Sequence, residues 1–130
     1  MEFLADIDFV ENVWKESLEG VSGEARRFAE SHSRSSFAIS VPTSIRLLAS
    51  VGADDEAIVE RFMQAFPVLS FDQALIGRTA ALFRAHEIPL ETAIEGAIAK
   101  QHELKILTGS PSRYLALPGV KVVNFRQSED

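Results

Sequence analysis

Short apolar segments alternate with amphipathic helical patterns along the 130-residue chain, and this alternation constrains the fold more than any other feature. The apolar segments are nearly continuous, which is typical of strands in a parallel sheet that helices cover on both faces. We expect these strands at residues 2–8, 37–41, 104–108 and 121–125, with a brief strand or extended connector at 67–71. The chain is therefore predicted to form a three-layer α/β fold, with a mostly parallel central sheet flanked by helices, as one domain over residues 1–130.

Between these segments, apolar residues recur at the spacing of helices. We expect helices at residues 9–18, 22–31, 42–51, 54–66, 72–86 and 89–98, and a short helix that begins at Ser110-Pro111. Ser22 is expected to cap the second of these helices, and Thr43, Ser44 and Ser110 lie at helix starts where capping explains them.

Charge is unevenly distributed. The chain has 13 Lys and Arg against 19 Asp and Glu, which gives a net charge of −6. Residues 1–60 hold five basic and twelve acidic residues, whereas residues 61–130 hold eight and seven. The absence of a basic stripe argues against passive binding of duplex nucleic acid. An acidic protein can still act on nucleic acid through divalent cations held by carboxylates, or it can bind a basic protein.

The absence of cysteine excludes several kinds of chemistry: disulfides, thiol nucleophiles and cysteine-ligated zinc or iron–sulfur sites. No Gly-rich phosphate loop, nucleophile-elbow serine or pair of histidines at metal spacing is present. No apolar run reaches the roughly 18 residues of a membrane span, and no signal peptide is evident. We expect a cytoplasmic protein that does not contact membranes.

Ligands of open α/β sheets bind outside the carboxyl ends of the strands, so residues at these ends are the candidates for a site. Asp6 and Asp8 follow the first strand, and they share one side if that strand continues through them. Such a pair could hold a hard divalent cation. For Asp8 we favour a structural role, because Glu11 lies three residues later, as in a reciprocal helix cap. Asp6 needs a partner, because it ends a buried strand.

The order of these elements resembles that of PIN domains, above all the VapC-type toxins of toxin–antitoxin pairs. Residues 4–10, which read LADIDFV, resemble the strand-ending Asp-Thr-Asn start of that family. Further similar strings follow in the family's order at residues 38–43, 66–72, 88–89, 97–99, 106–108 and 118–125. The resemblance covers nearly the whole chain. It implies a parallel sheet between helices, a homodimer, and a cluster of acids that binds Mg²⁺ or Mn²⁺ for RNA cleavage.

The acids that the resemblance implies are mostly replaced in this chain. Asp6 matches the first acid, Asp8 stands where the family has Asn, and Thr108 matches. The remaining expected acids fall at residues of other types, namely Arg46, Thr92, Ser110 and Arg113; with Thr43 and Thr108 these residues would line the pocket.

These replacements disfavour a metal centre, because one carboxylate rarely holds Mg²⁺ and because Arg46 and Arg113 would repel a cation. We predict that Asp6 forms an ion pair with one of the two arginines. Glu91 and Glu95 are possible substitute acids, since Glu95 lies three residues after Thr92 on the same helical face. We favour the alternative explanation, in which they belong to a solvated helix face and Glu91 is a first-turn acid.

Three functions follow. The first is a PIN-fold protein with an impaired or inactive centre, retained for binding a partner or RNA, in which case it has no cofactor. The second is an active Mg²⁺- or Mn²⁺-dependent endoribonuclease toxin that uses Asp6 and Glu95 as catalytic residues, with Asp6, Asp8, Glu91 and Glu95 as metal ligands. The third is an unrelated α/β binding domain. The resemblance implies a homodimer and a small basic antitoxin-type partner.

Overall fold

The computed structural model describes residues 2–127. Four short strands form one parallel sheet in the order β2-β1-β3-β4. The strands are β1 (Phe3–Ala5), β2 (Phe37–Ala38), β3 (Lys105–Thr108) and β4 (Val122–Asn124). The α-helices are α1 (Ile7–Glu19), α2 (Glu24–Ser31), α3 (Val41–Ser50), α4 (Glu56–Met63), α5 (Gln73–Ala85) and α6 (Leu90–His102), and the 3₁₀ helices are η1 (Ala53–Asp55) and η2 (Pro111–Tyr114). The predicted three-layer α/β fold with a parallel sheet is confirmed.

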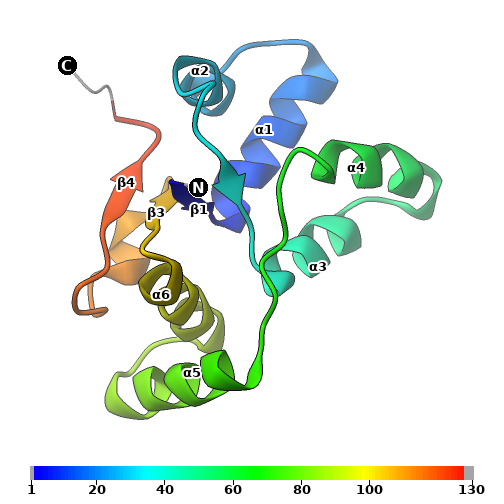
Figure 1. Cartoon of the computed structure of the whole chain (residues 1–130). Helices are drawn as coiled ribbons and strands as arrows, with labels where there is room; N and C mark the ends of the chain where they lie inside the picture. The colour runs from blue at the N-terminus through cyan, green and yellow to red at the C-terminus, as the bar shows by residue number, and fades with distance from the viewer. Residues whose placement is uncertain (1, 128–130) are drawn as a thin grey trace.

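The strands are apolar on both faces because each face has its own core. In β1, Phe3 and Ala5 pack into the core beneath α1 to α4, whereas Leu4 packs on the opposite face with α5 and α6. Figure 1 shows α1 and α2 on one side of the sheet, α5 and α6 on the other, and α3 with α4 beyond the β2 edge. Successive side chains of a strand point to opposite faces, so a strand between two helical layers must be apolar at every position.

The connector at residues 67–71 lies beside β2. Val68 pairs with Ile39 through an isolated parallel bridge, with hydrogen bonds on both sides of it. The expectation of a brief strand or extended connector is confirmed. It carries the chain from the α4 side of the sheet to the α5 side.

The prediction that Asp6 and Asp8 share one face of a strand is wrong. The strand ends at Ala5, and α1 begins at Ile7. Asp6 is the N-cap of α1, since its Oδ1 accepts from the Phe9 N–H at 3.3 Å. Asp8 lies in the first turn instead of capping with Glu11, so that prediction is also wrong. A buried acid at the end of a strand is best satisfied by the free N–H groups of a helix that starts at once.

The capping roles predicted for four other residues are also wrong, namely those of Ser22, Thr43, Ser44 and Ser110. The N-cap of α2 is Gly23, and the Ser22 hydroxyl instead donates to Glu30. The first N–H groups of α2 are satisfied from α1, because the Glu16 carboxylate accepts from the backbone of residues 25 and 26. The cap of α3 is Ser40, so Thr43 and Ser44 serve other purposes. Ser110 precedes η2 without capping it through its side chain.

Candidate functional site

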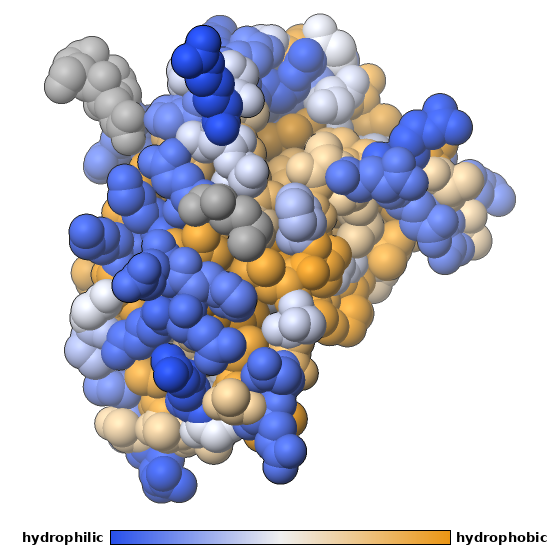
Figure 2. Space-filling model, viewed as in Figure 1, coloured by the Kyte–Doolittle hydropathy of each residue, from blue (hydrophilic) through white to orange (hydrophobic). Residues whose placement is uncertain are grey.

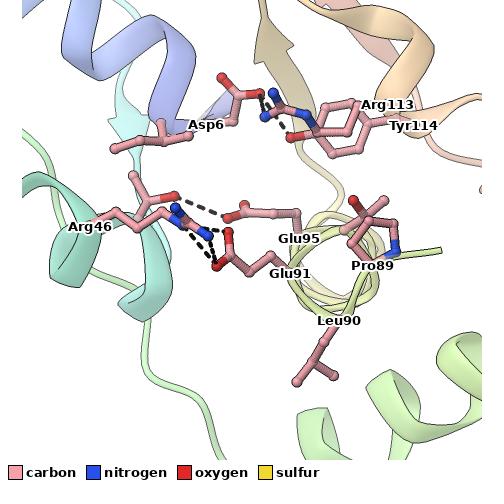
Figure 3. A pocket seen from close by; sticks show the side chains of 11 residues that line it. Asp6, Arg46, Pro89, Leu90, Glu91, Glu95, Arg113 and Tyr114 are labelled. Atoms are coloured by element: carbon pink, nitrogen blue, oxygen red, sulfur yellow. Dashed lines mark hydrogen bonds and ion pairs between the residues drawn. The ribbon is translucent and has the colours of Figure 1, made fainter.

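A pocket of about 490 Å³ lies where β1 ends, between the first turns of α1, α3 and α6 and the helix η2 (Figure 3). It is lined by Asp6, Ile7, Thr43, Arg46, Pro89, Leu90, Glu91, Thr92, Glu95, Arg113 and Tyr114. The carboxyl end of a parallel sheet is where ligands of such folds bind. Seven of the residues predicted for the site line this one pocket, along with Tyr114, which was not predicted.

Asp6 forms the floor of the pocket and is only 2% exposed. Its Oδ2 accepts from the Tyr114 hydroxyl at 2.8 Å and from Arg113 Nη1 at 3.4 Å, while Oδ1 caps α1. Burial raises the pKa of Asp6, and hydrogen bonds from Thr108 and Tyr114 partly offset this rise. The predicted ion pair therefore forms with Arg113. It is a single long contact and not a pair of parallel hydrogen bonds.

Glu95 is the second buried acid of the pocket. It is 5% exposed, and its Oε1 accepts from the Ser40 hydroxyl at 2.6 Å and from the Thr43 hydroxyl at 3.1 Å. Its Oε2 is buried and has no hydrogen-bond partner within residues 2–127. Burial raises the pKa of Glu95 to about 7, against the two hydroxyl hydrogen bonds that lower it, and the charges of Asp6 and Glu91 add to the rise. The Glu95 carboxyl is thus only partly ionised at neutral pH.

Arg46 and Glu91 form the rim. Arg46 Nε lies 2.8 and 2.7 Å from the two carboxylate oxygens of Glu91, and its Nη2 lies 2.6 Å from Oε1. Hydrogen bonding to Glu91 raises the pKa of the Arg46 guanidinium. Both side chains are about half exposed. Arg46 therefore neutralises Glu91 and not Asp6.

The remaining predicted residues divide between the pocket and a second location. Thr92 is buried and lines the pocket, and Thr108 lies behind Asp6 with its Oγ1 accepting from the Ser110 N–H at 3.0 Å. The Ser110 hydroxyl faces away from the pocket and donates to Asp8 at 3.4 Å. The pocket therefore gathers fewer of these residues than the sequence suggested.

Asp8 lies outside the pocket, in a cluster of its own. Its Oδ2 accepts from the Gly109 N–H at 3.1 Å, and its Oδ1 lies 3.7 Å from Arg126 Nη2. Arg126 also pairs with Glu24 at 3.5 Å and stacks over the ring of Phe125. Asp8 ties α1 to the loop after β3 and to the segment after β4.

Two residues of the site, Tyr114 and Ser40, were not predicted. Tyr114 is 3% exposed, and burial together with the negative charge of Asp6 raises the pKa of its hydroxyl, so the hydroxyl stays protonated and donates. A signal for it was available: a buried tyrosine needs a hydrogen-bond partner, and this one directly follows the predicted Arg113. Ser40 could be found as the polar residue between an apolar strand and Val41-Pro42.

The donor set does not fit a resident Mg²⁺ or Mn²⁺. Both oxygens of Asp6 accept protein hydrogen bonds, and both oxygens of Glu91 bind Arg46. Only Oε2 of Glu95 is left without a partner in this set. Within residues 2–127, no three His, Asp or Glu side chains lie together in an arrangement that could hold a metal ion. Hard cations need several carboxylate oxygens, and here those oxygens are already occupied.

Comparison with solved structures identifies the fold. The chain is similar to a chain of a toxin–antitoxin complex from Klebsiella pneumoniae, with a TM-score of 0.75 and 23% identity over 96% of this chain and 98% of that one. It is also similar to a chain of VapBC-1 from nontypeable Haemophilus influenzae, with a TM-score of 0.78 and 11% identity over 98% and 100% of the two chains. A chain of DNA-bound VapBC from Salmonella typhimurium gives a TM-score of 0.71 and 19% identity over 96% and 98%.

No protein-family model and no curated protein matches the sequence. The resemblance to PIN domains is confirmed at the level of the fold, along almost the entire chain. No helix within residues 2–127 is long and apolar enough to cross a bilayer.

Proposed function

We propose that this chain is the toxin-type member of a cytoplasmic toxin–antitoxin pair, built on a PIN domain whose metal-dependent ribonuclease centre is impaired or inactive. The fold shared with toxin–antitoxin complexes over at least 96% of the chain supports the family, and it disfavours the alternative of an unrelated α/β domain. The impairment rests on one observation. The carboxylates of Asp6 and Glu91 are already occupied by the protein itself, since Asp6 accepts from Tyr114 and pairs with Arg113, and Glu91 pairs with Arg46.

The alternative of an active endoribonuclease requires Asp6, Glu91 and Glu95 to bind Mg²⁺ or Mn²⁺ together. These three acids do line one pocket, and Glu95 Oε2 is free to ligate. Against it, a cation would have to displace the guanidinium of Arg46 from Glu91 and that of Arg113 from Asp6. Asp8 cannot help without leaving its partners at Gly109 and Arg126.

Metal titration combined with an RNA cleavage assay tests this proposal. The wild-type chain should bind Mn²⁺ more weakly than micromolar by calorimetry and should not cleave RNA. The double variant Arg46→Glu/Arg113→Asp replaces both cations by the acids that the family resemblance implies, and it should bind Mn²⁺ measurably more tightly. Micromolar binding and cleavage by the wild type, both abolished in Asp6→Asn, would overturn the proposal in favour of the active enzyme.

A small basic antitoxin-type protein is the proposed partner. The charge of residues 1–60, with twelve acidic against five basic side chains, suits a basic protein. Co-expression with the product of a neighbouring small open reading frame should give a complex that co-elutes at a fixed ratio. A chain that stays free of that product at every ratio would contradict the pairing.

We also propose a homodimer that uses the surface formed by α3, the connector and α5. Three exposed apolar side chains lie there, Ile45 on α3, Val68 in the connector and Ile76 on α5, with exposed fractions of 60%, 47% and 54%. Figure 2 shows an apolar area over α3 and the connector. Light scattering at micromolar concentration should give twice the monomer mass, and Ile45→Glu should reduce it. A monomeric wild type would exclude the dimer.

A further inference from the structure

The sheet has one covered edge and one open edge. Beside β2, the connector covers the edge through the isolated bridge between Ile39 and Val68. The opposite edge is β4, and within residues 2–127 no strand pairs with its outer side. Figure 1 shows β4 at the margin of the molecule. An open strand edge is a template for a further strand, because its backbone groups already have the spacing of a ladder.

The pairing of β4 with β3 determines which backbone groups of β4 point outward. The Lys121 C=O accepts from β3 at 2.8 Å, and the Phe125 N–H donates to β3 at 3.2 Å. Successive residues of a parallel strand direct their backbone groups alternately to its two sides, so Val123 faces β3 whereas Val122 and Asn124 face outward. The Asn124 C=O accepts from the amide three residues later. The Val122 N–H and C=O and the Asn124 N–H have no partner within residues 2–127.

Two hollows border this edge, one at each end of β4. The first has a volume of about 370 Å³ and lies between the end of α6 and the segment before β4, where Lys100, Glu103 and Lys121 line it. The second has a volume of about 660 Å³ and lies between α2 and the segment after β4, where Arg27 and Arg126 line it. A strand added along β4 would therefore place a side chain over a hollow at each of its ends.

The charges of the two hollows are mostly positive. Lys100 and Lys121 of the first hollow and Arg27 of the second are exposed, and they form no ion pair within residues 2–127. Glu103 opposes the two lysines, whereas Glu24 of the second hollow is already in an ion pair. The three unpaired cations exceed the one unpaired acid, so the ends of the edge attract negative charge.

We propose that the open edge of β4 binds an extended acidic segment of a partner protein, which adds a strand to the sheet and places acidic side chains over the two hollows. The backbone groups of Val122 and Asn124 provide the hydrogen bonds of the new ladder, and the cations at both ends select an acidic sequence. The centre of the segment should be β-branched and apolar. Val122 and Val123 are half-buried on opposite faces of the sheet, so neighbours of this kind extend both cores.

This surface is separate from the pocket around Asp6. No residue that lines either hollow also lines the pocket. The segment that it fits is acidic, whereas the partner proposed for residues 1–60 is basic. The inference therefore adds a second interaction surface, and it does not depend on the state of the ribonuclease centre.

Fluorescence anisotropy of a labelled heptapeptide, Glu-Glu-Val-Thr-Val-Glu-Glu, tests the proposal on the full chain at low salt. The wild type should bind this peptide saturably below about 1 mM. The same peptide with N-methyl groups on its three central amides should bind about tenfold more weakly, because it keeps every charge and loses its ladder donors. The peptide Lys-Lys-Val-Thr-Val-Lys-Lys should not bind, because its charges oppose those of the hollows.

Two variants of the chain, each with a matched control, locate the binding on β4. Val122→Pro removes an outward N–H and keeps the ladder with β3, so it should weaken binding about tenfold, whereas Val122→Thr keeps the N–H and should bind within about twofold of the wild type. Lys121→Gln should weaken binding about threefold. Its control is Lys15→Gln, which removes the same charge from the exposed face of α1 and should bind within about twofold of the wild type.

Several outcomes would overturn the strand-binding edge. No binding of the acidic peptide would exclude the surface, and equal binding of the N-methylated peptide would reduce it to attraction between charges. Equal weakening by Lys15→Gln and Lys121→Gln would show that the attraction is not located at β4. If Val122→Pro loses its circular dichroism spectrum, the N-methylated peptide carries the same test on the wild-type chain.

Discussion

Asp6 and Asp8 are two residues apart, yet they belong to two regions with different chemistry. In the pocket, Asp6 and Glu95 are buried, and Asp6 is held by side chains from distant elements, with Tyr114 and Arg113 more than one hundred residues away. The cluster around Asp8 is half exposed, and its acid is satisfied by a backbone N–H and a loosely held Arg126. The helix start at Ile7 separates the two regions. A charge in the pocket therefore carries a large desolvation free energy, whereas a charge in the Asp8 cluster carries a small one.

The largest expected effect that separates the two regions is a pH dependence. The folded-state pKa of Glu95 is about 7, against 4.5 without burial. Between these values the folded chain binds more protons than the unfolded chain, so the free energy of unfolding should fall as pH rises from about 4.5 to about 7, by at most about 3 kcal/mol. Urea denaturation at pH 5 and pH 7.5 measures this difference. In Glu95→Gln this difference in unfolding free energy between the two pH values should largely vanish. If it remains, groups other than Glu95 cause it.

Truncation of the two aspartates should give the next largest contrast. Asp6→Ala removes a helix cap and leaves the Tyr114 hydroxyl buried without an acceptor, so we expect a loss of about 2–3 kcal/mol. Asp8→Ala removes contacts that water can replace, at a cost of about 1 kcal/mol. Chemical denaturation of both variants beside the wild type measures these losses. Equal losses would mean that the two regions are not distinct.

Loss of Arg113 should lower the free energy of unfolding more than loss of Arg46, because only Arg113 pairs with a buried acid. Arg113→Ala removes the cationic partner of a buried acid that keeps its other hydrogen bonds, and water reaches the gap, so about 1 kcal/mol is expected. Arg46→Ala breaks an exposed pair with Glu91 and should cost less than Arg113→Ala, because water screens that pair. The unfolding midpoint in urea compares them. A larger effect at Arg46 would show that its pair with Glu91 contributes more to stability than the pair of Arg113 with Asp6.

Within the Asp8 cluster, the smallest effect is expected at Gly109. A Cβ at this position would lie 2.5 Å from Asp8 Oδ2 and 2.6 Å from Arg126 Nε. Both contacts involve the ends of side chains that can move, so Gly109→Ala should cost only about 0.5–1 kcal/mol. Thermal unfolding followed by circular dichroism is sufficient to detect it. A loss of stability greater than that of Asp6→Ala would show that the side chains of Asp8 and Arg126 cannot move to make room for the Cβ.

The sequence was sufficient for the fold and for the place of the site. Continuous apolar strands between helical patterns predict the sheet, and acids at the end of β1 mark its carboxyl edge. The sequence could not show that Asp6, and not Asp8, caps α1. The answer depends on whether one residue or three residues separate the end of β1 from the first residue of α1. The same applies to the arginines. The sequence indicates that a cation must compensate Asp6. Which cation does so depends on the tertiary structure: η2 places Arg113 beside Asp6, and the packing of α6 beside α3 pairs Arg46 with Glu91.

The order of the sheet has a consequence for how the chain acquires its pocket during synthesis. Central β1 is translated among the first residues, but its neighbour β3 is translated only at residues 105–108. A ribosome-bound chain that lacks β3 can form α1 and α2 but cannot complete the sheet, and nascent β1 must stay open or pair with the short β2. Arg113 and Tyr114 emerge later still, so the buried carboxylate of Asp6 has no counter-charge until more than one hundred further residues have been made. Folding of this domain is therefore expected to wait until β3 and η2 have left the ribosome, and a chain that stops before β3 should be a target for proteases.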